Sequence, residues 1–186
     1  TAANAAVNMN KLLQISSGAV YTDDGDSLEF DIKHRYKVLR EVIDESTKKV
    51  LVFVPFKHVI DILTGKLIND GIPTEVIRGD VSASKRTDIF KRFQTNAAPQ
   101  VLVIQPAAAA HGVTLTAANT VVWWGPTSSL ETYAQANARV HRSGQDHKCT
   151  AVQLQGSFAE RRVYSLLDNR IDDHTKMIDL YKEILD

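Results

Sequence analysis

Residues 50–71 read VLVFVPFKHVIDILTGKLINDG, an apolar run followed at once by a stretch of helical period. The run at 50–55 is rich in valine, which is typical of a strand buried on both faces. Beyond it, apolar side chains recur at three- and four-residue spacing, at Phe56, Val59, Ile60, Leu63 and Leu67. Gly71 follows where a left-handed residue would end such a helix. The stretch therefore predicts one strand followed by one helix.

The same pattern repeats along the chain. Four further runs are rich in valine, isoleucine, leucine or aromatic residues, at 74–78, 101–105, 120–124 and 149–155. Stretches of helical period separate them, and another precedes the first strand, around Tyr36, Leu39 and Ile43. Strands that alternate with helices favour an α/β fold around a parallel sheet.

Two pairs of residues predict helix starts. Ser128 with Glu131, and Ser157 with Glu160, have the spacing of a capping box, in which the serine and glutamate side chains bind each other's backbone amides. From the second start, helical spacing continues over residues 163–185, with a break near residues 172–173.

The N-terminal part differs from this alternation. Residues 22–27 are polar and acidic and contain a glycine, which predicts a loop. We therefore expect an N-terminal helix and loop at 1–28, leading into a main domain at 29–186. The chain opens at Thr1 rather than at methionine, as a piece of a longer polypeptide would.

Composition excludes several classes of protein. The 186 residues are 44% hydrophobic, which suits a soluble domain that buries roughly 70% of its unfolded surface. Twenty-two basic residues balance 22 acidic ones, so any contact with nucleic acid depends on a local patch. Cys149 is the only cysteine, which excludes an intrachain disulfide and favours a reducing, cytoplasmic setting. The apolar runs are too short to span a bilayer, so we expect no membrane partner.

The clearest chemical signal lies in residues 135–145, QANARVHRSGQ. On a helix that begins at Ser128, the side chains of Gln135, Arg139 and Arg142 are four and three residues apart and project from one face. Guanidinium groups stay charged and bind phosphate oxygens through two parallel hydrogen bonds. This face is therefore a candidate phosphate site. The alternative is a solvated basic helix end, where cationic side chains favour the helix dipole.

This stretch resembles the sixth motif of superfamily-two helicases in its Swi/Snf translocase form, with glutamine-alanine, arginine, histidine-arginine and glycine-glutamine in that order. Other segments resemble further parts of the same family in the family's order, at 14–21, 50–55, 74–93 and 101–124. The resemblance implies a RecA-like three-layer α/β/α domain with a mainly parallel sheet of about five or six strands. It also implies the second lobe of an ATP-dependent DNA helicase or translocase.

The resemblance implies roles for single residues near the nucleotide. Arg139 and Arg142 would reach the γ-phosphate of ATP, with Gln135 as a third catalytic residue. Gly112 and Thr114 would bind the nucleotide together with the two arginines. The implied cofactor is ATP with magnesium, whose ligands lie on the family's first lobe. That lobe is the implied protein partner.

A second set of residues is expected to contact double-stranded DNA. Lys57 and Arg78 lie near the ends of the first two predicted strands and suit contacts with the phosphate backbone that are independent of base sequence. Gly79 and His111 lie in segments that resemble family motifs. Surface solvation explains the basic residues equally well.

The chain departs from the family pattern in the fifth motif. Pro106 stands where the family usually has a hydroxyl residue, and Ala109 and Ala110 stand where it has glycines. Alanine restricts the close approach of backbone amides to a phosphate. Thr114 replaces an asparagine or aspartate, so a contact with the ribose would depend on its hydroxyl.

The residues that would hold the phosphates and magnesium are missing. Gly65 and Lys66 form the only Gly-Lys pair, but Leu67 follows and helical periodicity continues through them. Asp44 and Glu45 fit a helix end better than a magnesium-binding pair. We therefore expect this fragment to be catalytically inactive alone. His141, His147 and Cys149 lack a convincing fourth ligand, so no metal site is expected.

Two other functions remain open at this point. One is a stand-alone RecA-like module that binds nucleic acid or regulates a partner without ATPase activity. The other is the lobe of an RNA helicase. Gln145 after Gly144, together with the run Leu115, Thr116, Ala117 and Ala118, favours the DNA translocase.

Overall fold

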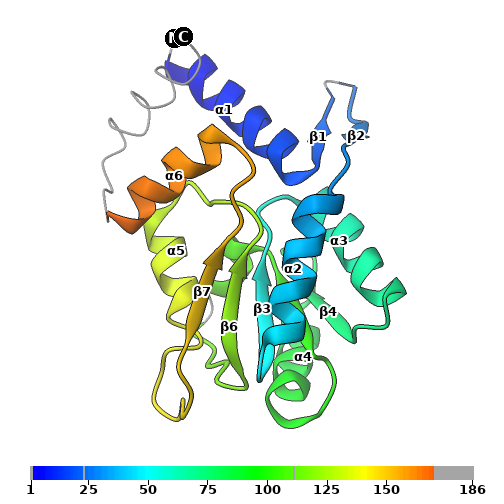
Figure 1. The fold of residues 1–186 in the computed structure, drawn as a ribbon, viewed down its shortest axis with the longest axis vertical. Helices are drawn as coiled ribbons and strands as arrows, with labels where there is room; N and C mark the ends of the chain where they lie inside the picture. The colour runs from blue at the N-terminus through cyan, green and yellow to red at the C-terminus, as the bar shows by residue number, and fades with distance from the viewer. Residues whose placement is uncertain (1, 23, 111, 170–186) are drawn as a thin grey trace.

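A five-stranded parallel sheet forms the centre of the computed structural model, which describes residues 2–22, 24–110 and 112–169. Its strands are β3 (Lys49–Phe53), β4 (Thr74–Ile77), β5 (Val101–Ile104), β6 (Ala118–Trp123) and β7 (Thr150–Gln153). They are ordered β4-β5-β3-β6-β7 (Figure 1). The sequence predicted each of these strands to within two residues at either end.

The central strand β3 explains why these sequences are so apolar. Val52 lies opposite Val103 of β5 on one side and Val122 of β6 on the other, both in parallel register. Side chains of β3 point alternately to the two faces, and both faces are covered. Leu51 and Phe53 enter one hydrophobic cluster, whereas the valines of β3 enter the other.

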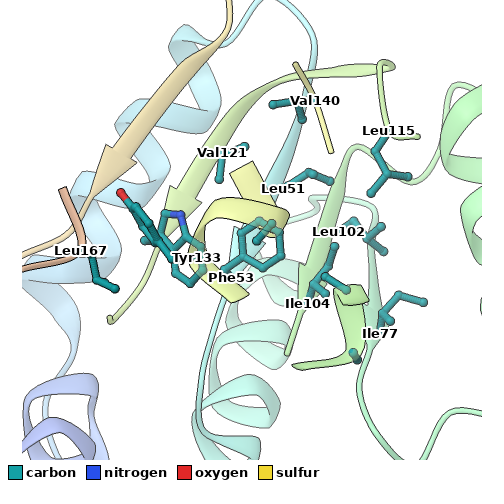
Figure 2. Close-up of a cluster of buried hydrophobic side chains, with 14 of the residues drawn as sticks. Leu51, Phe53, Ile77, Leu102, Ile104, Leu115, Val121, Tyr133, Val140 and Leu167 are labelled. Atoms are coloured by element: carbon teal, nitrogen blue, oxygen red, sulfur yellow. The ribbon is translucent and has the colours of Figure 1, made fainter. Parts of the chain in front are cut away.

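Helices cover both faces of the sheet, which confirms the three-layer α/β/α prediction. One face carries α2 (Lys33–Glu45) and α3 (Lys57–Asn69). The other carries α4 (Ala83–Thr95), α5 (Leu130–Asn137), α6 (Phe158–Asp168) and the short 3-10 helix η1 (Pro106–Ala110). Figure 2 shows this second core, where the Phe53 and Tyr133 rings lie among aliphatic side chains of three other strands.

Local chemistry sets the helix ends. Gly71 follows α3 with φ of +78°, a left-handed conformation that favours glycine, as predicted. The predicted capping box of Ser157 and Glu160 is confirmed at the start of α6. The predicted pair with Ser128 is wrong by one residue, because Ser129 caps α5 and accepts from the amide of Thr132 at 3.1 Å. The amide of Ser129 donates to the Thr127 hydroxyl, a local turn that delays the helix.

The N-terminal segment contains more structure than the predicted helix and loop. After α1 (Ala2–Ser17), strands β1 (Ala19–Tyr21) and β2 (Ser27–Glu29) pair as an antiparallel hairpin. Figure 1 shows α1 beside α6, at the end of the molecule toward which the sheet strands point. Met9 and Leu13 of α1 are buried in the same cluster as α6.

The C-terminal end of the prediction is covered only in part. Helix α6 accounts for its beginning, and the predicted helical residues from 170 onward lie outside the described residues. None of the helices in the described part of the chain has the length and apolar character that crossing a bilayer requires.

A buried ion pair joins α2 to α6. Arg35 Nη2 lies 2.5 Å from Glu160 Oε2, and the Glu160 side chain is fully buried. The other end of the Arg35 guanidinium donates to the Trp124 carbonyl oxygen. Glu160 Oε2 also accepts from the amides of Gly156 and Ser157, at 2.7 and 3.1 Å. This carboxylate therefore depends on Arg35 to compensate its charge.

We predict that Arg35→Ala lowers the free energy of unfolding by about 3–5 kcal/mol, because it leaves the buried Glu160 charge unpaired. Urea denaturation followed by circular dichroism measures the change. Arg161→Ala, at an exposed position on α6, is the control and is expected to change stability by less than about 0.5 kcal/mol. Equal stability of the two variants would contradict this role of the pair.

Candidate functional site

Two loops that carry predicted nucleotide residues meet at one edge of the sheet. Residues 112–117, which we call the threonine loop, lead into β6, and residues 138–149, the arginine loop, join α5 to β7. Since β6 and β7 are parallel neighbours, both begin at the same edge. The amide of Leu115 donates to the Arg139 carbonyl oxygen at 2.9 Å and joins the loops. Figure 1 shows the arginine loop, mostly yellow, at the end opposite α1.

The arginines do not lie on a helix, which corrects the sequence prediction. Helix α5 ends at Asn137, and the chain then turns inward so that Val140 enters the core at 2% exposure. Burial of that apolar side chain outweighs the continued helical periodicity. A turn follows in which the amide of Gln145 donates to the Arg142 carbonyl oxygen at 3.1 Å. Gly144 has φ of +92° in this turn, a conformation that L side chains rarely adopt.

Arg142 contacts both other residues that were predicted to bind the nucleotide. Its Nη1 donates to the Gly112 carbonyl oxygen at 3.2 Å and to Thr114 Oγ1 at 3.4 Å. The rest of the guanidinium group is exposed and has donors left for a ligand. The structure thus brings together three residues that are up to 30 positions apart in the sequence.

Arg139 lies beside this group in a different environment. Its exposed fraction is only 4%, and its Nε is buried without a hydrogen-bond partner among the described residues. No carboxylate of the described residues forms an ion pair with it, in contrast to Arg35 with Glu160. Burial, and then the positive charge of Arg142, lower the pKa of Arg139. A buried cation without a counter-ion, next to a second cation, favours the binding of an anion.

Two glutamine side chains hold the threonine loop in place, and sequence reasoning gave them no role in the site. From α4, Gln94 Oε1 accepts from the Ala117 amide at 2.9 Å. From the arginine loop, the Gln145 side chain donates to the carbonyl oxygens of Thr116 and Ala118. Only the position of Gln145 directly after a glycine marked it in the sequence, and no pattern marked Gln94.

An open hollow of about 830 Å³ adjoins Arg142. Its lining residues come from both loops and from the approach to β7: Thr114, His141, Arg142, Ser143, Gln145, His147, Lys148 and Cys149. Arg142 and Lys148 bring positive charge to this lining, so the hollow suits an anionic ligand.

Gln135 does not join the arginines. It lies in the last turns of α5, where its Nε2 donates to Glu131 Oε1 at 2.8 Å. Because α5 ends before Arg139, the helical face that was predicted to carry all three side chains does not exist. Its catalytic role remains a prediction.

The residues predicted to contact DNA lie at the opposite edge of the sheet. Lys57 begins α3 directly after β3, and Arg78 and Gly79 follow β4, so all three are at the carboxyl ends of the strands. Lys57 is exposed, whereas Arg78 is paired with Asp61 at 2.5 Å and with Asp80 at 2.9 Å. His111 lies outside the described residues.

These ion pairs change what Arg78 can do. Burial pulls the pKa of Arg78 down, but its hydrogen bonds and the charges of Asp61 and Asp80 outweigh that effect and raise it. A guanidinium with two carboxylate partners has little net charge to offer a phosphate. The backbone beside it is held as well, because the Gly79 amide donates to Gln105 Oε1 at 3.2 Å.

The metal-binding side chains near the two loops do not form a cluster in the described part of the chain. Within the described ranges, no three side chains of histidine, cysteine, aspartate or glutamate gather closely enough to hold a metal ion. Cys149 is a free thiol whose Sγ lies 3.7 Å from the Val140 carbonyl oxygen. The residues of the two loops suit phosphate oxygens, which guanidinium, hydroxyl and amide groups bind.

Comparison with known families gives a match over most of the described chain. Residues 34–144 match the family model of the helicase conserved C-terminal domain. This range includes the threonine loop and both arginines. The chain spans 7% to 20% of the length of the curated relatives that it resembles.

Individual relatives come from two branches. A SWI/SNF-related regulator of chromatin, subfamily A-like protein 1 of Xenopus tropicalis, is 31% identical over 63% of this chain and 12% of its own length. The ATP-dependent RNA helicase DBP2 of Scheffersomyces stipitis is 30% identical over 58% of this chain and 20% of its own length. The crystal structure of the C-terminal part of the Fun30 ATPase domain shares the fold, with a TM-score of 0.69 at 24% identity over 84% of this chain and 53% of that one.

We predict that Arg139→Met raises the free energy of unfolding of the chain by about 1–3 kcal/mol, because it replaces a buried, unpaired cation with an apolar side chain of similar length. The control is Arg142→Met, at an exposed position, with an expected change below about 0.5 kcal/mol. Urea denaturation without phosphate or nucleotide measures both variants. A clear loss of stability in Arg139→Met would mean that the guanidinium is compensated in the folded chain.

Proposed function

Because the chain belongs to the family of helicase conserved C-terminal domains, we propose that it is the second lobe of an ATP-dependent DNA translocase of the Swi/Snf type. In this proposal a first lobe elsewhere in the polypeptide binds the phosphates and magnesium. The observation that carries the proposal is the buried Arg139 side chain, which has no ion-pair partner among the described residues and lies beside Arg142. Gly112 and Thr114 accept hydrogen bonds from Arg142.

The two arginines have different roles in this proposal. ATP supplies the phosphoryl group that is transferred to water. Arg142, which is exposed, directs its free donors at the γ-phosphate and stabilises the charge that develops there during transfer. Arg139, which is desolvated, strengthens the positive potential of the site because a buried charge is weakly screened. Neither residue acts as nucleophile or base, so the chain alone is expected to be inactive.

The opposite edge of the sheet is the proposed DNA surface. Lys57 lies at the N-terminus of α3, where its ammonium and the helix dipole both attract a phosphate. Arg78 is a weaker candidate because of its two carboxylate partners. The balanced net charge leaves only such local contacts to hold DNA. Binding by this lobe is therefore weak and independent of base sequence.

The chain between β5 and β6 links the two edges. β5 ends at Ile104 at the carboxyl edge, and the threonine loop precedes β6 at the amino edge. In the proposed cycle, closure of the two lobes around ATP moves this segment relative to the DNA, and repeated closure and opening produce translocation.

RNA is the second candidate substrate, because DBP2 is named as an RNA helicase and its identity to this chain is close to that of the SWI/SNF-related relative. Lobe 2 of either enzyme would place the arginines similarly, so the nucleotide site does not distinguish the two. ATP hydrolysis by the complete polypeptide is measured with duplex DNA and with duplex RNA. Stimulation by DNA supports a DNA translocase, and stimulation by RNA supports an RNA helicase. Stimulation by neither supports a stand-alone module.

We predict that Arg142→Lys in the complete polypeptide lowers kcat for ATP hydrolysis by about 10³-fold while KM for ATP changes little. Lysine keeps the charge but loses the planar fork that binds two oxygens, so transition-state contact suffers most. Phosphate release at saturating duplex DNA measures both constants. The control is Arg161→Lys, at an exposed position on α6, and turnover of Arg142→Lys equal to that of the control would refute the assignment.

We predict that Lys57→Ala reduces the slope of log affinity against log salt by about one unit on any duplex, because one phosphate contact is lost. Arg78→Ala has a smaller effect since its charge is already paired. Fluorescence anisotropy with two unrelated duplexes over a salt series gives the slopes, and Lys91→Ala is the control. A slope that Lys57→Ala leaves unchanged would place the DNA surface elsewhere.

A further inference from the structure

The carboxamide of Gln145 forms hydrogen bonds through both its nitrogen and its oxygen inside the candidate site, with the two Nε2 hydrogens shared among three acceptors. Its Nε2 donates to three carbonyl oxygens, of Ala118 at 2.8 Å, Val140 at 3.1 Å and Thr116 at 3.3 Å. Its Oε1 accepts from the His147 amide at 3.1 Å. Only a carboxamide has two N–H donors and an acceptor on one planar group. Glutamate has no donor for the three carbonyl oxygens.

These bonds connect segments that carry the arginines and Thr114. Thr116 lies near the end of the threonine loop, Ala118 is the first residue of β6, and Val140 lies between the two arginines. The first pairing of β7 with β6 is Thr150 with Thr120. The Gln145 side chain therefore joins the arginine loop to residues that precede Thr120, where the two strands are not yet paired.

Other contacts leave the tip of the arginine loop weakly held. The Leu115 to Arg139 bond anchors its start, and β7 anchors its end. Residues 141–144 are all exposed, and within the described ranges the Arg142 side chain makes only two hydrogen bonds, both long, of 3.2 and 3.4 Å. The amide of Gln145 closes the turn on the Arg142 carbonyl oxygen, so the position of Gln145 fixes the backbone of Arg142.

From this geometry we propose that Gln145 is a positioning residue, whose carboxamide locks the arginine loop to the threonine loop and so places the Arg142 guanidinium for catalysis. The inference rests on the proposed function of Arg142. It assigns Gln145 no contact with the nucleotide. Loss of the carboxamide displaces Arg142, and a displacement near 1 Å in a catalytic group costs on the order of 10²-fold in rate.

The test uses the complete polypeptide with saturating duplex nucleic acid. Gln145→Met keeps the length of the side chain and removes all four hydrogen bonds. We expect kcat to fall on the order of 10²-fold and KM for ATP to change less than about twofold, because ground-state binding is not the function of Arg142. Gln155→Met, at an exposed glutamine whose only described side-chain bond is to Gln153, is the control and keeps normal kcat.

A double variant separates positioning from general damage. If Gln145 acts through Arg142, Arg142→Ala combined with Gln145→Met is no slower than Arg142→Ala alone. If the two losses multiply, Gln145 acts by another route and the positioning role is wrong. Circular dichroism checks folding of each variant. If Gln145→Met does not fold, Gln145→Asn, which keeps donors and acceptor one methylene short, replaces it with the same expected loss of kcat.

The outcomes also separate this inference from the proposed function. Slow turnover in Arg142→Ala with normal turnover in the Gln145 variant refutes the positioning role alone. Normal turnover in both variants refutes the catalytic role of Arg142 and, with it, the role of Gln145. A rise in KM for ATP without a fall in kcat assigns Gln145 to nucleotide binding and contradicts the proposal.

Discussion

The parallel direction of the five strands is the constraint on which the arrangement of this molecule depends. Each parallel connection must return the chain to the edge where the next strand begins, so loops from distant parts of the sequence gather there. The threonine loop and the arginine loop meet for this reason, on either side of α5. The same constraint sends Lys57, Arg78 and Gly79 to the other edge. The sheet therefore separates Arg139 and Arg142 from Lys57 and Arg78.

Two arginines, Arg35 and Arg139, show opposite solutions to placing a positive charge. Arg35, elsewhere in the fold, is buried together with a carboxylate and serves stability. Arg139 is buried without one, which costs stability in the absence of a ligand. A fold that tolerates such a group keeps its site charged and partly desolvated before any ligand arrives. Binding sites commonly lower the stability of the fold in this way, because the groups that bind a ligand are not the groups that would stabilise the free protein.

Periodicity in the sequence was sufficient for the sheet and insufficient for the site. Strand β3 is apolar and fully buried from Val50 to Phe53 because both faces are covered, so its pattern is unambiguous. The end of α5 was not predictable in the same way, since Arg139 and Arg142 continue its spacing. Only the burial of Val140 against the sheet turns the chain, and that depends on tertiary contacts. The family resemblance marked Arg139 and Arg142 together, and their role stays a prediction; it gave no indication of the bonds made by Gln94 and Gln145.

The contacts of α1 bear on where this unit of structure begins. The match to the family model starts at residue 34, yet the indole N–H of Trp124 donates to the carbonyl oxygen of Ser17 at 2.8 Å, and Trp124 is fully buried. Gly125 also packs closely against Ser17, since a Cβ atom added to this glycine would lie 2.8 Å from the Ser17 hydroxyl oxygen. A polypeptide cut at residue 34 would lose that carbonyl and would uncover the surface beneath Met9. Here the segment that sequence comparison recognises is shorter than the segment whose side chains pack into one core.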